Sequence, residues 1–126
     1  MKKLFLRNRD GQSIIEFAVL LPILLMVIFG ITEFGRAILV KNVLHTAARE
    51  GARLAVVSDS TSAHARVLEV LDAANVTPTE ISILYNIPAR KVEVTVKTDF
   101  EVLSGGILDP FMGIFPLKGK TVMRLE

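Results

Sequence analysis

The sequence predicts an α+β protein in which one long N-terminal helix carries a small C-terminal head. Residues 14–31 contain a single charged side chain, Glu16. As a helix this run would be about 27 Å long, close to the hydrocarbon thickness of a bilayer. After this run, apolar residues recur at helical spacing as far as Val57, which indicates an amphipathic helix. Beyond residue 80 the apolar period changes to two, which indicates strands.

Composition narrows the choice of protein class. The chain has 126 residues and no cysteine, so it holds at most one small domain and uses no disulfide or thiol chemistry. The net charge is +2, but the first 11 residues contribute +3 and the remainder −1. The basic balance therefore does not indicate nucleic acid binding. Basic residues on one side of a span predict a cytoplasmic N-terminus instead.

The N-terminal half is predicted to contain a leader and one continuous helix. Residues 1–11 form a basic leader, and residues 12–57 form the helix. Within the helix, residues 14–32 are transmembrane and residues 33–57 are amphipathic, with small side chains that permit close packing in its last third. A cleaved secretory signal peptide is disfavoured, because the apolar run is long and no small-x-small cleavage site follows it.

Residues 58–126 are predicted to form the head. A polar break at 58–62 supplies candidate N-caps for a short helix, and an alternating apolar pattern follows. A head this small is marginal alone, so we expect it to pack on the upper half of the long helix. The expected elements are a helix at 63–74, strands at 81–86, 92–96 and 118–125 that pair antiparallel, a hairpin loop at 87–90, and an irregular apolar stretch from 104 to about 116.

The most informative motif joins the leader to the apolar run. Gly11 and Gln12 are followed by Glu16 and Phe17. Glu16 thus places a carboxylate at the N-terminal end of the candidate membrane span. A charge there is costly and is a functional hypothesis by default. Gly11 has no Cβ to obstruct a protease that approaches the backbone. The alternative is that Glu16 simply reaches back to the membrane interface.

Two charged groups follow the apolar run. Glu33 and Arg36 are spaced i, i+3 at its far boundary, either as a subunit contact or as an interfacial ion pair. Arg49 and Arg53 share a helix face, and Glu50 is within i, i+3 reach of Arg53. This second group is predicted either to contact the head or a partner subunit, or to form a plain solvated face.

No pattern in the sequence indicates catalysis. His45 and His64 have no second ligand at metal spacing, and no nucleophile elbow or phosphate-binding loop occurs. We therefore predict a protein that is not an enzyme and that uses no metal or cofactor.

Several separated motifs resemble the TadE-like family, the pseudopilins of the tight-adherence (Tad, or Flp) pilus systems of bacteria. The resemblance covers roughly residues 10–55. The motifs, in order, are Gly11-Gln12-Ser13, Glu16-Phe17-Ala18, Pro22, Glu33-Phe34-Gly35-Arg36 and Ala47-Ala48-Arg49-Glu50-Gly51-Ala52-Arg53.

The resemblance implies a pilin-like lollipop in the bacterial inner membrane, with a cytoplasmic N-terminus and a periplasmic head. It implies cleavage by a prepilin peptidase between Gly11 and Gln12, with Glu16 and Phe17 guiding recognition and subunit registry. The usual pair in this class is glutamate-tyrosine, so Phe17 keeps the ring and loses the hydroxyl. The implied partners are the peptidase, a major Flp-type pilin, a second pseudopilin, the inner-membrane assembly platform and membrane lipid. Whether the subunit enters the pilus stays open.

A rival hypothesis is an uncleaved single-pass anchor whose head binds a partner in the envelope. Gly11 and Glu16 would then be incidental. A bulky replacement of Gly11 separates the two hypotheses, because pilus assembly fails under the first and is indifferent under the second.

Overall fold

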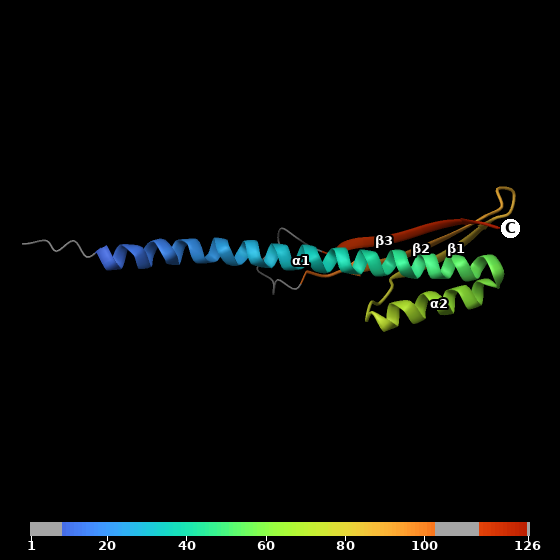
Figure 1. Cartoon of the computed structure of the whole chain (residues 1–126), viewed down its shortest axis with the longest axis horizontal. Helices are drawn as coiled ribbons and strands as arrows, with labels where there is room; N and C mark the ends of the chain where they lie inside the picture. The colour runs from blue at the N-terminus through green and yellow to red at the C-terminus, as the bar shows by residue number, and fades with distance from the viewer. Residues whose placement is uncertain (1–8, 103–113, 126) are drawn as a thin grey trace, which may run out of the picture. The chain divides into compact units, whose positions relative to one another are not determined.

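The computed structural model describes residues 9–102 and 114–125, and Figure 1 shows its elements. Most of the predicted leader, all of the predicted irregular stretch before residue 114, and Glu126 lie outside the described residues. The chain divides after Phe34 into two compact units. The predicted α+β class is confirmed. The elements are α1 (Arg9–Val57), α2 (Ser60–Ala73), β1 (Glu80–Asn86), β2 (Lys91–Phe100) and β3 (Phe115–Arg124).

The first unit contains the apolar part of α1. The helix begins at Arg9, three residues before the predicted start at Gln12. Gly11 is a weak helix former, but no proline stands in this turn to prevent the earlier start. Pro22 lies inside the helix, as the sequence predicts for a membrane-spanning segment.

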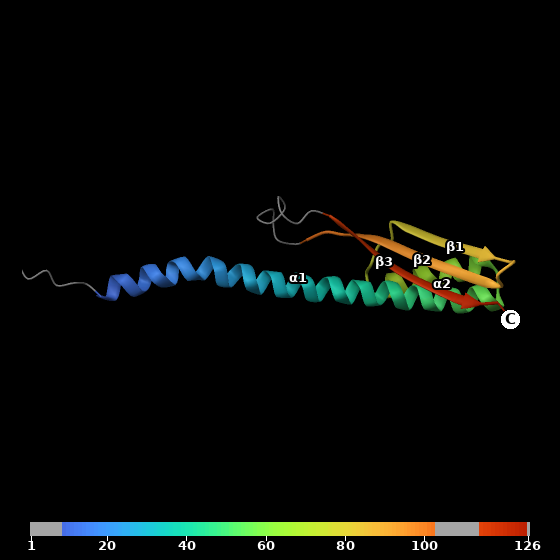
Figure 2. The ribbon, with the colours of Figure 1, turned by 90° about the horizontal axis from the view of Figure 1, so that it is seen from above.

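In the second unit, the last part of α1 packs against the head. Figures 1 and 2 both show α2 returning alongside this part of α1. The small residues of α1 form the contact face and are buried, which confirms the predicted close approach. They are Ala47, Ala48, Gly51, Ala52 and Ala55.

Helix α2 begins at Ser60 rather than at the predicted Ala63, because Asp59 serves as the N-cap residue. The Ser62 hydroxyl donates a hydrogen bond of 2.6 Å to the Asp59 carboxylate and ties down the first turn. The apolar spacing of the sequence predicts that four residues of this helix face inward, namely Val67, Leu68, Leu71 and Ala74. Val67 and Leu71 are buried and Leu68 is half-buried. Ala74, also predicted to face inward, is exposed, because it is the C-cap residue and the helix has ended.

The end of α2 is closed by a left-handed residue. Asn75 has φ of 54°, a conformation that asparagine tolerates better than most residues. The Val76 N–H bonds the Leu71 carbonyl at 2.9 Å, and the Asn75 N–H bonds the Asp72 carbonyl at 3.0 Å. This is the Schellman pattern, which satisfies the last carbonyls and directs Val76 onto the core.

The sheet has the order β1-β2-β3, with both pairs antiparallel (Figure 2). Along β2 the even-numbered residues from Val92 to Phe100 are buried and the odd-numbered ones are not. This confirms the predicted alternation and extends it past Val96. The third strand begins at Phe115, three residues before the predicted start, because its partner β2 is long enough to pair Phe115 with Phe100.

The predicted hairpin loop at 87–90 is confirmed. The Arg90 N–H bonds the Ile87 carbonyl at 3.1 Å, and Arg90 takes a left-handed φ of 48°. One core joins the inner face of the sheet to α1 and α2. Its fully buried larger side chains are Leu44, Val67, Leu71, Val92, Val94 and Val96.

Candidate processing and assembly sites

The candidate cleavage site lies in the first turns of α1. Gly11 and Gln12 are helical, and the first four N–H groups of a helix have no partner within it. Apart from the neighbouring backbone of its own helix, a Cβ added to Gly11 would meet no atom of the described residues within 4 Å. The fold therefore does not require glycine at this position. Unfolding the first turn of α1 for a protease costs little free energy, because few hydrogen bonds hold that turn.

Glu16 is exposed and its carboxylate reaches back one turn. The Gln12 side-chain amide donates a hydrogen bond of 3.1 Å to Glu16 Oε1. Phe17 is 62% exposed. It lines a shallow apolar groove along the helix around Pro22, together with Leu20, Leu21, Ile23, Leu24 and Val27.

The apolar run after Glu16 has no cover within the described chain. Every large hydrophobic residue from Ile14 to Ile31 is exposed. Exposure of this extent is unusual in water and marks a protein or membrane contact. Among the described residues, α1 is the one helix long and apolar enough to cross a membrane. A membrane anchor is thus consistent with the structure.

Arg36 binds the end of β2. Its guanidinium carbon lies 4.4 Å from the centroid of the Phe100 ring, and its Nη2 donates a hydrogen bond to the Glu101 carbonyl oxygen. Neither Glu33 nor Arg36 is without a partner. Sequence reasoning predicted a subunit contact or an interfacial ion pair for Arg36. It did not predict the contact with Phe100, because the two residues are far apart in the chain.

The three charged residues of the second motif do not behave alike. Arg49 and Arg53 are exposed. Glu50 turns to α2, where its carboxylate lies 3.7 Å from the guanidinium of Arg66. The partner found for Glu50 is thus Arg66, rather than the Arg53 that the i, i+3 spacing suggested. Arg66 also bonds Glu69 at 2.9 Å, and these carboxylates, Glu69 first, raise the pKa of Arg66.

Two glycines determine how closely the head approaches α1. A Cβ on Gly51 would lie 2.3 Å from Val67 Cγ2. A Cβ on Gly119 of β3 would lie 2.4 Å from the Leu44 carbonyl carbon and 2.7 Å from the His45 nitrogen. Sequence reasoning missed Gly119. Its one signal was an isolated glycine inside a strand pattern, which marks a close backbone approach or a bulge.

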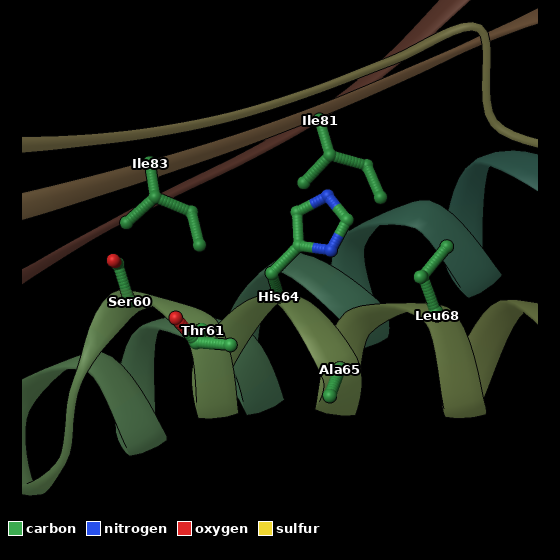
Figure 3. Close-up of a pocket in the computed structure, with 7 residues that line it drawn as sticks. All are labelled: Ser60, Thr61, His64, Ala65, Leu68, Ile81 and Ile83. Carbon is green, nitrogen blue, oxygen red and sulfur yellow. The ribbon is translucent and has the colours of Figure 1, made fainter.

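A groove of about 460 Å³ lies between α2 and β1. Figure 3 shows the imidazole of His64 pointing across it toward Ile81. Within residues 9–102 and 114–125, no three histidine, cysteine or acidic side chains converge as a metal site would require. The groove is lined by Ser60, Thr61, His64, Ala65, Leu68, Ile81 and Ile83.

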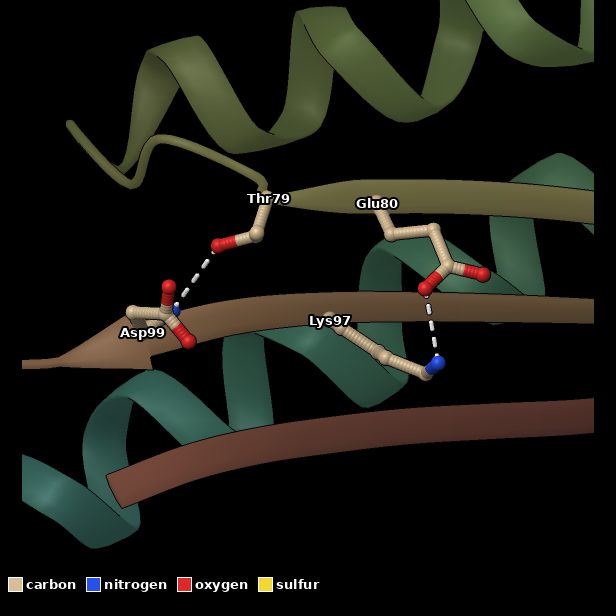
Figure 4. Close-up of polar contacts among 4 residues, drawn as sticks. All are labelled: Thr79, Glu80, Lys97 and Asp99. Atoms are coloured by element: carbon tan, nitrogen blue, oxygen red, sulfur yellow. Dashed lines mark hydrogen bonds and ion pairs between the residues drawn. The ribbon is translucent and has the colours of Figure 1, made fainter. Parts of the chain in front are cut away.

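The outer face of the sheet carries several ion pairs and hydrogen bonds, beside the exposed Leu84 and Val122. Lys97 and Glu80 form an ion pair of 2.7 Å, and the Thr79 hydroxyl accepts a hydrogen bond of 3.1 Å from the Asp99 N–H (Figure 4). Lys120 pairs with Glu93 at 2.7 Å. Such contacts fix strand register and suit a solvated face.

Fold and sites together define a small α+β head on an apolar helix long enough to span a membrane. A family model described as TadE-like protein matches residues 11–53, which confirms the resemblance over that segment. The match suggests involvement in Tad pilus systems. No curated protein and no solved structure matches the chain.

Proposed function

We propose that this chain is a non-catalytic pseudopilin or minor pilin that takes part in assembly of a Tad-type pilus. Residues 14–32 hold it in the bacterial inner membrane, with its N-terminus in the cytoplasm and its head in the periplasm. A prepilin peptidase cleaves it between Gly11 and Gln12. The observation that carries the proposal is an unobstructed glycine five residues before the carboxylate of Glu16, at the start of an exposed apolar helix.

The surroundings of Gly11 support a role outside the fold. Glycine costs a helix about 1 kcal/mol relative to alanine, so it is retained where something other than helix stability requires it. Among residues 9–102 and 114–125, no packing neighbour within 4 Å of the Gly11 Cβ position supplies such a reason. A peptidase that must approach the Gly11–Gln12 bond closely does supply one.

Glu16 supports the proposal because its carboxylate contacts residue 12, where cleavage would create a new N-terminus. The Gln12–Glu16 hydrogen bond of 3.1 Å shows that the carboxylate extends back to residue 12. Cleavage would create a positive α-amine on Gln12, either as a local partner for Glu16 or as a partner for the Glu16 of a neighbouring subunit. Pairing of this kind lowers the cost of placing Glu16 in a membrane.

The test is the intact mass and N-terminal sequence of the protein from native membranes, with and without the prepilin peptidase. We expect a chain that begins at Gln12 only when the peptidase is present. Gly11→Phe should block this processing and pilus assembly. Gly30→Phe is the matched control, because Gly30 lies in the same helix and also has no atom within 4 Å of its Cβ position. It should be processed normally.

Retention of residues 1–11 in both strains would contradict the proposal. The uncleaved single-pass anchor, whose head binds an envelope partner, would then be the better account. Equal processing of the Gly11→Phe and Gly30→Phe variants would show that Gly11 is not the recognition residue.

A further inference from the structure

We infer that copies of this chain pack side by side, with the exposed basic stripe of α1 in one copy against the acidic face of α2 in the next. The basic stripe is Lys41, Arg49 and Arg53. The acidic face is Glu69 and Asp72. The inference rests on the proposed function, which anchors all copies in one membrane with their heads on the same side.

The basic stripe has no compensating charge on its own helix. Lys41, Arg49 and Arg53 are exposed, and within the described chain none of them forms an ion pair. Glu50 is the one acidic residue between positions 35 and 57, and it is turned to Arg66. A row of like charges on one helix face favours an acidic partner.

Helix α2 supplies an acidic surface. Glu69 and Asp72 are exposed on one face, and Asp72 has no ion-pair partner among the described residues. Glu69 pairs with Arg66, but its side chain is 69% exposed, so it is accessible to a second cation. Ser62 and Ala65 lie on the same exposed face, and their small side chains let another helix approach.

Contact between α1 and α2 fixes their relative height. Val67 fills the space at Gly51, so residues 51 and 67 are level. The two helices run in opposite directions (Figure 1) and rise equally per residue. Arg49 is therefore level with Glu69, and Arg53 is level with Ala65.

The equal height of Arg49 and Glu69 within one copy also applies between two copies that are anchored in the same membrane. Two neighbouring copies whose heads stand at the same height place Arg49 of one copy against Glu69 of the other. Asp72 then falls between Arg49 and Lys41. The two faces differ, so the contact is heterologous, and such a contact repeats from copy to copy in an open row. The partner that fits best is therefore a second copy of the same chain.

The absence of cysteine makes a direct test possible. Two differently tagged full-length copies, one with Arg53→Cys and the other with Ala65→Cys, are expressed together and oxidised in native membranes. We expect a disulfide between the two tags. The control replaces Ala65→Cys by Lys118→Cys, on the exposed outer face of the sheet, and should give none. No disulfide, or equal yields from Ala65→Cys and Lys118→Cys, would overturn the inference.

Charge exchange tests the pairing itself. Arg49→Glu added to the Arg53→Cys copy should lower the yield several-fold, because a surface ion pair with Glu69 is replaced by repulsion between two carboxylates. Glu69→Arg added to the Ala65→Cys copy should do the same, and both changes together should restore the yield. Asp72→Arg, which leaves the Arg66–Glu69 pair intact, should also lower it. Failure of the combined exchange to restore the yield contradicts the pairing of Arg49 with Glu69.

The two proposals fail separately. A chain that is processed at Gln12 yet gives no Arg53–Ala65 disulfide retains the proposed function and loses this inference. A chain that keeps its leader yet forms the disulfide supports the contact and loses the processing.

Discussion

Gly119 of β3 lies directly on the Leu44 peptide of α1, with its Cβ position 2.5 Å from the Leu44 carbonyl oxygen. Both contacted groups are backbone, so no side-chain rotation can make room. Gly119 pairs with Val96 at the centre of β2, and its neighbours on both strands depend on this approach. The head is thus held to the long helix at a position where only glycine fits.

The first prediction concerns this contact. Gly119→Ala should destabilise the head by about 3 kcal/mol, the upper part of the usual range for overpacking, because two backbone segments must separate. The measurement is urea unfolding of the full chain in detergent, followed by fluorescence of Tyr85. This is the single tyrosine, no tryptophan is present, and its hydroxyl donates a hydrogen bond of 3.3 Å to the Ala55 carbonyl.

Gly35→Ala is the matched control for Gly119→Ala. Gly35 is in α1, and a Cβ there meets nothing within 4 Å. Its replacement should leave stability unchanged or raise it by up to about 1 kcal/mol through helix propensity. Equal effects of the two substitutions would show that the Gly119–Leu44 approach is not close in solution.

The second prediction concerns the contact between α1 and α2. Gly51→Ala should destabilise by about 1–2 kcal/mol, because overpacking against Val67 exceeds the gain in helix propensity. Val67→Ala alone should also destabilise, through the cavity it leaves. The variant with both Gly51→Ala and Val67→Ala should lose less stability than the sum of the two single losses, since the methyl group added at position 51 fills part of the cavity left at position 67. Strict additivity in the same unfolding assay would contradict direct contact.

Local patterns in the sequence were sufficient to predict most of the fold. The run of small residues at 47–55 predicted a close-packed face, and the alternation at 92–96 predicted a half-buried strand, because each is a period within one element. The start of α1 was predicted three residues too late. The starts of α2 and β3 were also predicted three residues too late. Those boundaries depend on the Asp59 cap and on pairing with β2, which a local period does not report.

The candidate sites also divide into those defined by a local spacing and those that depend on contacts between distant residues. Gly11, Glu16 and the apolar run could be predicted, since a short spacing defines them. The contact of Arg36 with Phe100 and that of Gly119 with Leu44 could not, because each joins residues more than 60 positions apart. Their partners follow only from the register of β2 and β3.

The third prediction concerns Arg36 and Phe100. A double-mutant cycle with Arg36→Gln and Phe100→Leu should give a coupling free energy of about 0.5–1 kcal/mol, the range for a cation over an aromatic face. Leucine retains most of the apolar burial and removes the ring. Arg36→Lys should recover part of the coupling, as it keeps the charge but loses the planar group. Zero coupling in detergent-solubilised protein would show that Arg36 does not stack on Phe100.

The fourth prediction concerns pH and the N-cap of α2. The hydrogen bond from the Ser62 hydroxyl, the largest influence on this carboxyl, holds the pKa of Asp59 below its ordinary value of 3.8. A lowered folded-state pKa gives a contribution to stability that is present above about pH 4 and is lost as the pH falls through the lower folded-state value. Asp59→Ala should therefore be less stable than the parent at neutral pH, and this difference should shrink steadily below pH 4. Carboxyl-carbon NMR of Asp59 gives the pKa directly, and Ser62→Ala should raise it toward its ordinary value. An Asp59 pKa that does not respond to Ser62→Ala would show that the hydroxyl is not the cause.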